Sequence, residues 1–433
     1  MTDRPDNTIE LGELESLVPG PTLGPVVPAG RGSFASAFDV DHVVFTAAAA
    51  VNAAFGERTL DLRRAVALCA GRALVAGEPV PVWSDLSGYY ETSGGGHIQF
   101  HCNFPHHAAG VVAELGCDPT RESIQAAVLR RDAQELESAL IGQGMIAARL
   151  RTLDEWRAHP HAVATAALPL ISVERIGDGP PRSVDRRRRV LDCSRIIAGP
   201  VAGQVFASRG ADVLRIGSQH LPSVDIGVLT TGSGKRNAFV ELDTSAGVAT
   251  MRGLLDDVDV WVDAYRPGGF EGHGFSLDTV APGSVTVQVS AFDWVGPWAG
   301  RRGFDSIVQS TTGIVRAGSE AAGTTEPTPL PVQALDYCTG LLAAFAGERL
   351  VQHQSEVGGT WLARLSLLRT RNWLVGRAAP KPFTPASPEV SPDAMQTTTT
   401  PFGEVTTARP LAGSWPHGPQ PLGSSAPVWQ GER

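Results

Sequence analysis

Residues 190–217 read VLDCSRIIAGPVAGQVFASRGADVLRIG, and this segment indicates the fold class. It contains a short apolar strand at 190–191, a turn of small residues at 198–203, a short helix and a second strand at 212–216. Strands that alternate with helices in this way are typical of parallel βαβ units, because parallel strands need a long crossover connection. The segment therefore predicts an α/β fold.

The residues that follow continue the same rhythm. VDVWVDAYRPG at 258–268 and SVTVQVSAF at 284–292 each predict another strand, and LLDDV ends a helix before Val258. We predict a Rossmann-like open parallel sheet with helices on both faces in the C-terminal half. Ligands of such sheets bind beyond the carboxyl ends of the strands. Those ends carry residues 194–198, 217–220, 265–268 and 291–296.

The clearest boundary is GDGPPRSVDRRRRV at 177–190, where turn residues and a basic cluster separate two unlike halves. We predict a smaller α+β N-terminal domain at 1–178, a linker at 179–189, the α/β domain at 190–377 and a tail at 378–433. The tail is rich in Pro, Ser and Thr and is expected to be loop-like. The four arginines at 186–189 are interpreted as solvated linker charge, in preference to a nucleic-acid patch.

The first half predicts mixed secondary structure. Pro and Gly at short intervals in residues 1–35 indicate an extended arm. The Ala-rich run at 43–75 predicts one or two helices, and the glycines at 94–96 predict a hairpin turn between strands at 87–92 and 97–104. Helices are expected at 106–116, 121–131 and 133–149, and a strand at 168–175.

Composition limits the classes of function. The chain has 433 residues and a net charge of −9, which argues against non-specific nucleic-acid binding. Five cysteines without a CxxC pair suggest neither a disulfide framework nor a zinc ribbon. The N-terminal residues have no apolar signal region and no stretch resembles a membrane span. We expect a cytoplasmic protein that binds no membrane.

Two apparent ligand motifs are weak. His101, Cys102, His106 and His107 resemble metal ligands, but their spacing matches no standard zinc pattern, so structural histidines are favoured and no metal is predicted. GSGKRN at 232–237 resembles a phosphate loop, but its spacing fails and Arg236 stands where Ser or Thr must bind magnesium. Lys235 and Arg236 remain candidates for direct contacts to phosphate.

A lone carboxylate, Asp336, precedes an apolar run in PLPVQALDYCTGLLAA at 329–344. An Asp in this place either caps a helix, or acts as a nucleophile or base whose pKa is raised by burial. The local sequence favours the cap, and both roles stay open. A second acid, Asp305, follows Arg301 and Arg302, and we expect an ion pair and a helix-capping or site-ordering role.

Six segments occur in order along the chain: LDCSRIIAGPVAG, GADVLRI, GKRNAFVELD, AYRPGGFEGHGF, VSAFDWVGPWAGRRGFDSIVQSTTG and QALDYCTGLLAA. Together they resemble the class III CoA-transferase family, which includes formyl-CoA and carnitinyl-CoA transferases and the related α-methylacyl-CoA racemases. The resemblance covers residues 188–375. Residues 1–178 resemble the family's smaller domain more weakly and in an unusual order, which implies a fusion, a permutation or a truncated tandem copy.

The resemblance implies a set of site residues. Asp336 occupies the position of the family's nucleophile, although Leu335 stands where the family usually has Gly. Gly217 stands where many relatives have an acidic residue. The resemblance places the nucleotide of CoA and its basic contacts at Ile196, Ile197, Ala198, Gly199, Arg215, Arg236 and Arg266.

The implied activity moves CoA from an acyl-CoA to a small organic acid through an acyl intermediate on Asp336. CoA is then a substrate, and no cofactor is bound permanently. The family implies a homodimer, either interlocked or mimicked by the two halves of one chain. A non-catalytic CoA-binding or scaffold protein is one alternative. A racemase is another, disfavoured because Phe304 stands where the racemases have a proton-carrying His.

Overall fold

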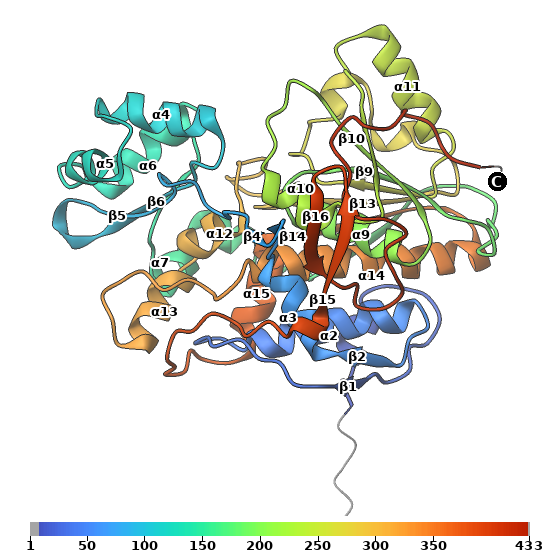
Figure 1. Ribbon diagram of the computed structural model, residues 1–433, viewed down its shortest axis with the longest axis horizontal. Coiled ribbons are helices and arrows are strands. Elements are labelled where there is room, and N and C mark those ends of the chain that lie inside the picture. The colour runs from blue at the N-terminus through green and yellow to red at the C-terminus, as the bar shows by residue number, and fades with distance from the viewer. Residues whose placement is uncertain (1–7, 432–433) are drawn as a thin grey trace, which may run out of the picture.

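The computed structural model describes residues 8–431 and has a mixed α/β fold, as predicted. The largest sheet has seven strands: β8 (Ser172–Gly177), β9 (Arg189–Cys193), β10 (Asp212–Gly217), β11 (Arg236–Phe239), β12 (Val260–Asp263), β13 (Val285–Ser290) and β14 (Thr360–Ser366). Their order across the sheet is β11-β10-β9-β12-β13-β14-β8 (Figure 1). All neighbouring pairs are parallel except β14 with β8, which is antiparallel.

Alternate residues of the strands face two different cores. Val190 and Val260 pack in the core that contains α9 (Ala198–Ser208) and α14 (Ala334–Val357). Leu191 and Trp261, their neighbours in sequence, pack in the core that contains α11 (Ser245–Leu255). Because side chains of a strand alternate between the faces of a sheet, both faces are covered by helices.

Helix α14 is the central helix of the molecule. It packs against α9 and against the Ala-rich helix α2 (Val40–Ala54), and it is buried along most of its length. Its crossing with α9 depends on Gly340, since a Cβ at this position would lie 2.4 Å from the carbonyl oxygen of Ala198. This crossing fixes the first turn of α14, which carries Asp336, beside the first turn of α9.

Residues 84–150 form a small lobe beside the large sheet (Figure 1). Its antiparallel strands are β5 (Gly88–Glu91), β6 (His97–Phe100) and β7 (Ala147–Arg149), and its helices are α4 (Pro105–Leu115), α5 (Arg121–Val128) and α6 (Ala133–Gly142). The predicted hairpin is therefore present as β5 and β6. The prediction of one helix over 133–149 is wrong at its end, because Gly144 takes a positive φ of 78° and turns the chain into β7.

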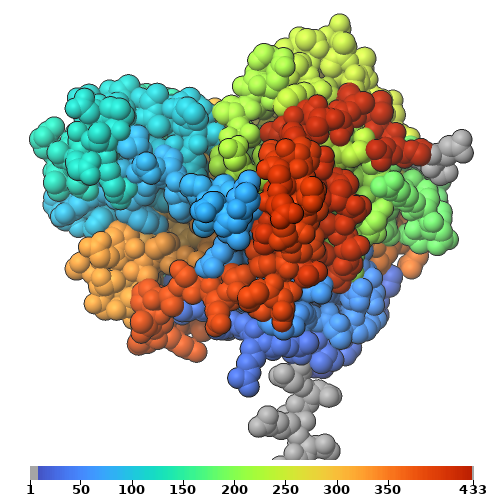
Figure 2. Space-filling view, viewed as in Figure 1, coloured from blue at the N-terminus to red at the C-terminus, as the bar shows by residue number. Residues whose placement is uncertain are grey.

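The two ends of the chain meet in a four-stranded sheet of order β15-β16-β3-β4. Its strands are β3 (Leu74–Val75), β4 (Glu78–Pro79), β15 (Met395–Thr400) and β16 (Gly403–Ala408). The prediction of a loop-like tail is therefore wrong over β15 and β16. Four consecutive threonines make β15 a good strand, because β-branched residues favour extended backbone. Figure 2 shows the C-terminal segment, in red, beside the blue N-terminal segment.

The predicted N-terminal arm has more structure than expected. Residues 1–7 lie outside the described residues, and the rest contains α1 (Gly12–Glu15) and β1 (Val27–Ala29), which pairs with β2 (Thr59–Asp61). The remaining helices are α3 (Leu62–Ala70), α7 (Leu153–Arg157), α8 (Pro160–Thr165), α10 (Asp225–Thr231), α12 (Asp305–Thr311), α13 (Ile314–Ala322) and α15 (Leu367–Arg377). Within residues 8–431, no helix is long and apolar enough to cross a membrane.

Of the four arginines at 186–189, only Arg187 is exposed, so our interpretation of solvated charge is wrong for the other three. Arg186 pairs with Asp259, and Arg188 with Glu348 at 2.9 Å. These partners lie in the α/β half, so the segment is bound to that half by charge pairs. The division into domains stays a prediction. We note that β8, which precedes the predicted boundary, is an edge strand of the large sheet.

Candidate active site

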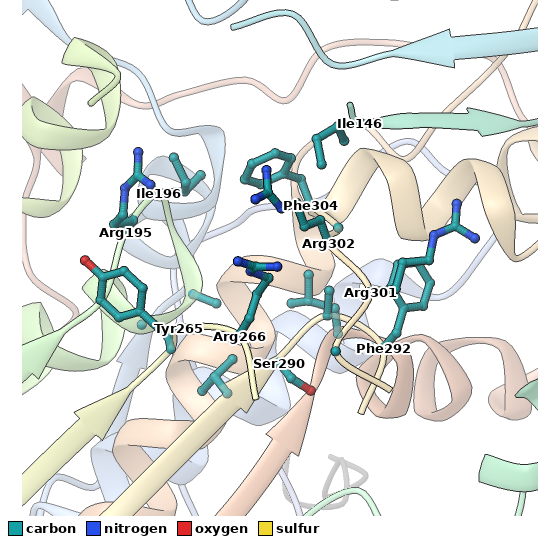
Figure 3. A pocket seen from close by; sticks show the side chains of 18 of the residues that line it. Ile146, Arg195, Ile196, Tyr265, Arg266, Ser290, Phe292, Arg301, Arg302 and Phe304 are labelled. Carbon is teal, nitrogen blue, oxygen red and sulfur yellow. The ribbon is translucent and has the colours of Figure 1, made fainter. Parts of the chain in front are cut away.

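The site with the most chemistry is a cavity of about 350 Å³ at the carboxyl ends of the parallel strands. We call it the arginine cavity, because four arginines line it (Figure 3). The small lobe supplies the opposite wall. The other lining residues that bear on the argument are Phe104, His106, His107, Ile196, Ala198, Gly199, Tyr265, Ser290, Phe304 and Asp336.

Three of the four, Arg195, Arg266 and Arg302, pair with no carboxylate in the described chain. Burial lowers the pKa of Arg195, and the charge of Arg215 lowers it further. Burial likewise lowers the pKa of Arg302, with a contribution from Arg266. Unpaired cations that repel one another are costly in a folded protein unless an anion binds between them. The arginine cavity is therefore suited to a polyanionic ligand.

Arg301, the neighbour of Arg302, has a different role. Its guanidinium pairs with Glu137 at 3.2 Å and lies 3.9 Å from the centre of the Trp298 ring. Figure 3 shows it beside Phe292. Arg301 thus connects the small lobe to the segment before α12, and it shares the carboxylate of Glu137 with Arg151.

The turn between β9 and α9 is strained. Ile196 takes a positive φ of 73°, which is unfavourable for a β-branched residue. Gly199 allows the turn to approach β9, since a Cβ there would lie 2.3 Å from the Cβ of Ser194. The N-cap residue of α9, Ile197, offers no side chain to its first amides. The positive end of α9 is therefore directed at the cavity wall without a side-chain cap.

Asp336 is the third residue of α14, and only 6% of its surface is exposed. Among residues 8–431, its carboxylate has no hydrogen-bond or ion-pair partner. Burial raises the pKa of Asp336 well above its ordinary value, and the nearby charge of Asp305 raises it further. A desolvated, unpaired carboxylate in a cavity wall is a candidate nucleophile or base.

Asp305 holds the first turn of α14 in place. Its carboxylate accepts a hydrogen bond from the amide of Asp336 at 2.9 Å and another from the side chain of Gln309. Burial raises its pKa to about 6, although these hydrogen bonds lower it. Asp305 does not cap its own helix, whose N-cap is Phe304, and its contact with the amide of Asp336 agrees with the site-ordering role. The expected ion pair is wrong, because Arg301 pairs with Glu137 and Arg302 has no carboxylate partner in the described chain.

The structure brings most of the predicted site residues together. Asp336, Ile196, Ala198, Gly199 and Arg266 all line the arginine cavity. Ile197 lines an adjoining cavity of about 320 Å³, which also contains the end of α3. We call this second space the α3 cavity. Asp336, Ile196 and Phe304 line both cavities, so Asp336 lies where the two meet.

Three predicted cationic contacts lie elsewhere. Arg236 is not brought to the arginine cavity, because its guanidinium is bidentate to Asp212 at 2.8 and 3.0 Å. Lys235 is fully buried and pairs with Asp192 at 2.7 Å. Arg215 lines a narrow pocket beside Ile196, and this pocket has a volume of about 20 Å³.

Sequence reasoning did not single out Arg195 and Arg302, which line the arginine cavity. Arg195 lies two residues after the end of β9, so its position near a strand end is a usable signal. The sequence places Arg302 close to Asp305, so an ion pair between them is expected. The structure shows that Arg301 instead pairs with Glu137, which is distant in sequence, and that Arg302 has no carboxylate partner in the described chain.

The histidines of the small lobe form no metal site in the described part of the chain. No group of three or more His, Cys, Asp or Glu side chains there is placed to bind a metal ion. His101 instead stacks on Phe304, with 4.1 Å between ring centres. Burial lowers the pKa of His101 to about 3 and that of His107 to about 4.

Comparison with known families agrees with this geometry. The family described as CoA-transferase family III matches residues 187–408, which is half of the chain. The chain belongs to CoA-transferase family III. The match includes the β9–α9 turn, the arginines of the cavity and Asp336. The N-terminal 186 residues, including the whole small lobe, lie outside it.

Individual relatives are similar over part of their length. The chain is 30% identical to the acetyl-coenzyme A transferase nodX of Hypoxylon pulicicidum over 227 residues, which cover 51% of this chain and 36% of that protein. It is 27% identical to the succinate–glutarate CoA-transferase of Agrobacterium fabrum over 234 residues, covering 47% and 58%. A crystal structure of a CAIB/BAIF family protein from Brucella suis is 22% identical, with a TM-score of 0.40 and coverage of 50% and 64%. The chain thus spans less than two thirds of the length of each.

Proposed function

We propose that this chain is a CoA-transferase that moves CoA between an acyl-CoA donor and a carboxylic acid acceptor through Asp336. The observation that carries the proposal is the position of Asp336. It is buried, unpaired among the described residues, and placed in the wall of a cavity that holds three arginines without carboxylate partners. The match to CoA-transferase family III over these same segments supports it.

CoA fits the charge and position of the cavities. Arg195, Arg266 and Arg302 supply guanidinium groups for its phosphates. A further cavity of about 250 Å³ lies at the ends of β10 and β11 and shares Leu221 and Tyr265 with the arginine cavity. In a Rossmann-like sheet, nucleotides bind beyond the carboxyl ends of the strands. The proposal therefore puts the nucleotide of CoA toward β10 and its thiol end toward Asp336.

The chemistry needs four substitutions at acyl carbons and no net proton transfer. A carboxylate oxygen of Asp336 attacks the thioester carbon of the donor, the C–S bond breaks, and an anhydride and CoA thiolate form. The thiolate attacks the Asp336 carbonyl, which releases the donor acid and leaves an aspartyl-CoA thioester. The acceptor carboxylate then attacks the carbonyl of this thioester, the C–S bond breaks, and a second anhydride and CoA thiolate form. The thiolate attacks the acceptor carbonyl of this anhydride, which gives the acceptor acyl-CoA and frees the carboxylate of Asp336.

The surroundings of Asp336 favour these steps. Burial removes water that would hydrolyse the anhydride or the thioester. The amide of Asp336 is held by Asp305, so the first turn of α14 is fixed. The uncapped amides at the start of α9 stabilise negative charge that develops nearby.

Both walls of the arginine cavity come from one chain, since the small lobe supplies Phe104 and His107 and the α/β half supplies Arg266 and Asp336. The two halves therefore take the place of two subunits in the proposal. The chain can still form a homodimer. Light scattering of the purified protein, with and without CoA, measures the oligomeric state.

The main test traps the intermediate. Incubation with an acyl-CoA donor and hydroxylamine should convert Asp336 to a hydroxamate that mass spectrometry of peptides locates, and Asp336→Asn should be neither labelled nor active. Asp178→Asn, at an exposed acid just after β8, is the matched control and should behave as the unmodified protein. Full activity of Asp336→Asn, or no label at Asp336 with any active donor, contradicts the proposal.

Two alternatives are separated by simple measurements. A non-catalytic CoA-binding protein would bind CoA in calorimetry and turn over no donor in a broad panel. A racemase would exchange deuterium at the α-carbon of the acyl group. We expect no exchange, because Phe304 stacks on His101 and itself carries no proton to transfer.

A further inference from the structure

The α3 cavity is the second space that reaches Asp336, and the proposed activity leaves it without a ligand. Its volume is about 320 Å³, close to that of the arginine cavity. This equals roughly ten water molecules at ~30 Å³ each, so it is large enough for a small organic acid. Much of its wall precedes residue 187 and lies outside the family match.

The lining of the α3 cavity differs in charge from that of the arginine cavity. One arginine, Arg72, lines it; that side chain is exposed and donates to the carbonyl of Pro388 at 3.3 Å. The remaining lining residues, apart from Asp336, are uncharged or neutral, and most are apolar. A cavity of this kind binds an apolar body better than a second charge.

Three rings form one wall of this cavity. His101 stacks on Phe304 at 4.1 Å, and Trp83 meets the edge of His101 at 5.7 Å. Nδ1 of the buried His101 has no hydrogen-bond partner in the described chain. Because burial lowers the pKa of His101 to about 3, the ring is neutral at physiological pH and does not attract a second carboxylate. Val332 and Ile226 add aliphatic surface.

We propose that the α3 cavity binds the body of the acceptor acid, and that the acceptor is a monocarboxylic acid with an aromatic or branched apolar group. This inference rests on the proposed transferase function. The carboxylate of the acceptor points toward Asp336, at the junction of the two cavities, and its apolar group lies against Trp83, His101 and Val332. The acceptor binds when Asp336 carries CoA as a thioester, because the aspartyl group is then uncharged and does not repel a second carboxylate.

The test compares acceptors of similar size with the donor that labels Asp336. We expect phenylacetate and 4-methylpentanoate to exceed glutarate in kcat/KM at least tenfold. Val332→Phe, which fills the cavity, should lower kcat/KM for phenylacetate at least tenfold while hydroxylamine still traps donor on Asp336. Val163→Phe makes the same change at a valine that is 67% exposed, and should leave both values unchanged.

A second variant guards against misfolding. Trp83 is 41% exposed, so Trp83→Ala removes one ring from the cavity rim with little risk to the fold, and should raise KM for phenylacetate more than it lowers kcat. A preference for glutarate that Arg72→Ala abolishes would overturn the proposal in favour of a dicarboxylic acceptor.

If Asp336 is labelled but neither Val332→Phe nor Trp83→Ala alters acceptor preference, the cavity assignment is wrong and the transferase function stands. Without any label at Asp336, the transferase function itself fails.

Discussion

Asp305 and Asp336 form a buried acidic pair in which one carboxylate orders the other residue. Asp305 accepts from the amide of Asp336, and its charge is the second cause, after burial, of the raised pKa of Asp336. Only the ionised form of Asp336 attacks a thioester. The rate should therefore fall on the acidic side at a pH above the usual range for an aspartate.

Replacing Asp305 with Asn tests this coupling. Asp305→Asn removes the charge but keeps a carbonyl oxygen for the amide of Asp336, so the pKa of Asp336 should fall and the acidic limb of kcat/KM should move to lower pH. The measurement is the pH profile of kcat/KM, with Asp178→Asn as the control at an exposed acid. A limb that stays in place would mean that Asp305 does not act on Asp336 through its charge.

At the scale of elements, the crossing of α14 with α9 positions both the nucleophile and the uncapped turn. In Gly340→Ala, the new Cβ would meet the carbonyl oxygen of Ala198 at 2.4 Å and Val201 at 2.8 Å. We expect a loss of about 1–3 kcal/mol in the free energy of unfolding and a lower kcat/KM, because the start of α9 must shift. Chemical denaturation and steady-state kinetics measure the two effects.

Gly253→Ala is the matched control for this substitution. Gly253 lies in helix α11, and a Cβ there meets nothing within 4 Å. It should be neutral or stabilise the protein by up to about 1 kcal/mol, since Ala restricts the unfolded chain. Equal effects of the two substitutions would show that the close crossing is not what makes Gly340 necessary.

Helix α14 also carries a buried acid that links stability to pH. Burial raises the pKa of Glu348 to about 7, and this outweighs its ion pair with Arg188 at 2.9 Å. The folded state therefore holds the proton more tightly than the unfolded state. The stability from this proton is complete below about pH 4, the range of an unfolded glutamate, and is lost as the pH rises through about 7.

Glu348→Gln should remove this dependence. Between pH 4 and 8, the free energy of unfolding of the unmodified protein should fall by ~2–3 kcal/mol relative to the variant, since a tenfold change in proton affinity corresponds to about 1.4 kcal/mol. Urea denaturation at several pH values measures it. Glu356→Gln, at an exposed position of the same helix, should leave the pH dependence unchanged.

At the scale of the whole molecule, the sequence predicts those secondary-structure elements that depend on residues close together in the chain. The alternation of strands and helices after Val190 and the hairpin around Gly94 are local patterns, and the structure has both. Long-range pairing was not predictable. Arg195 lies just after a strand and Arg236 begins one, so the sequence gives both a similar position. Only the fold shows that Arg236 is bound by Asp212 and that Arg195 lines the arginine cavity. The Thr-rich run of β15 favours a strand. It does not show that its hairpin partner, β16, pairs with β3 from the N-terminal half of the chain.

The charge distribution of the whole molecule leads to the last prediction. The chain carries a net charge of −9, yet the arginine cavity holds three cations without carboxylate partners among the described residues. CoA, a polyanion, is repelled by the protein as a whole and attracted by this one region, so its binding should weaken as salt is added.

Arg266→Gln should raise Kd for CoA roughly tenfold or more, because a hydrogen bond to a charged group contributes about 1.5–3 kcal/mol. It should also reduce the dependence of Kd on salt. Arg130→Gln, at an exposed arginine of the small lobe, is the control and should change neither. Calorimetry at several salt concentrations separates the two variants, and an equal response of both would place the phosphates of CoA outside the arginine cavity.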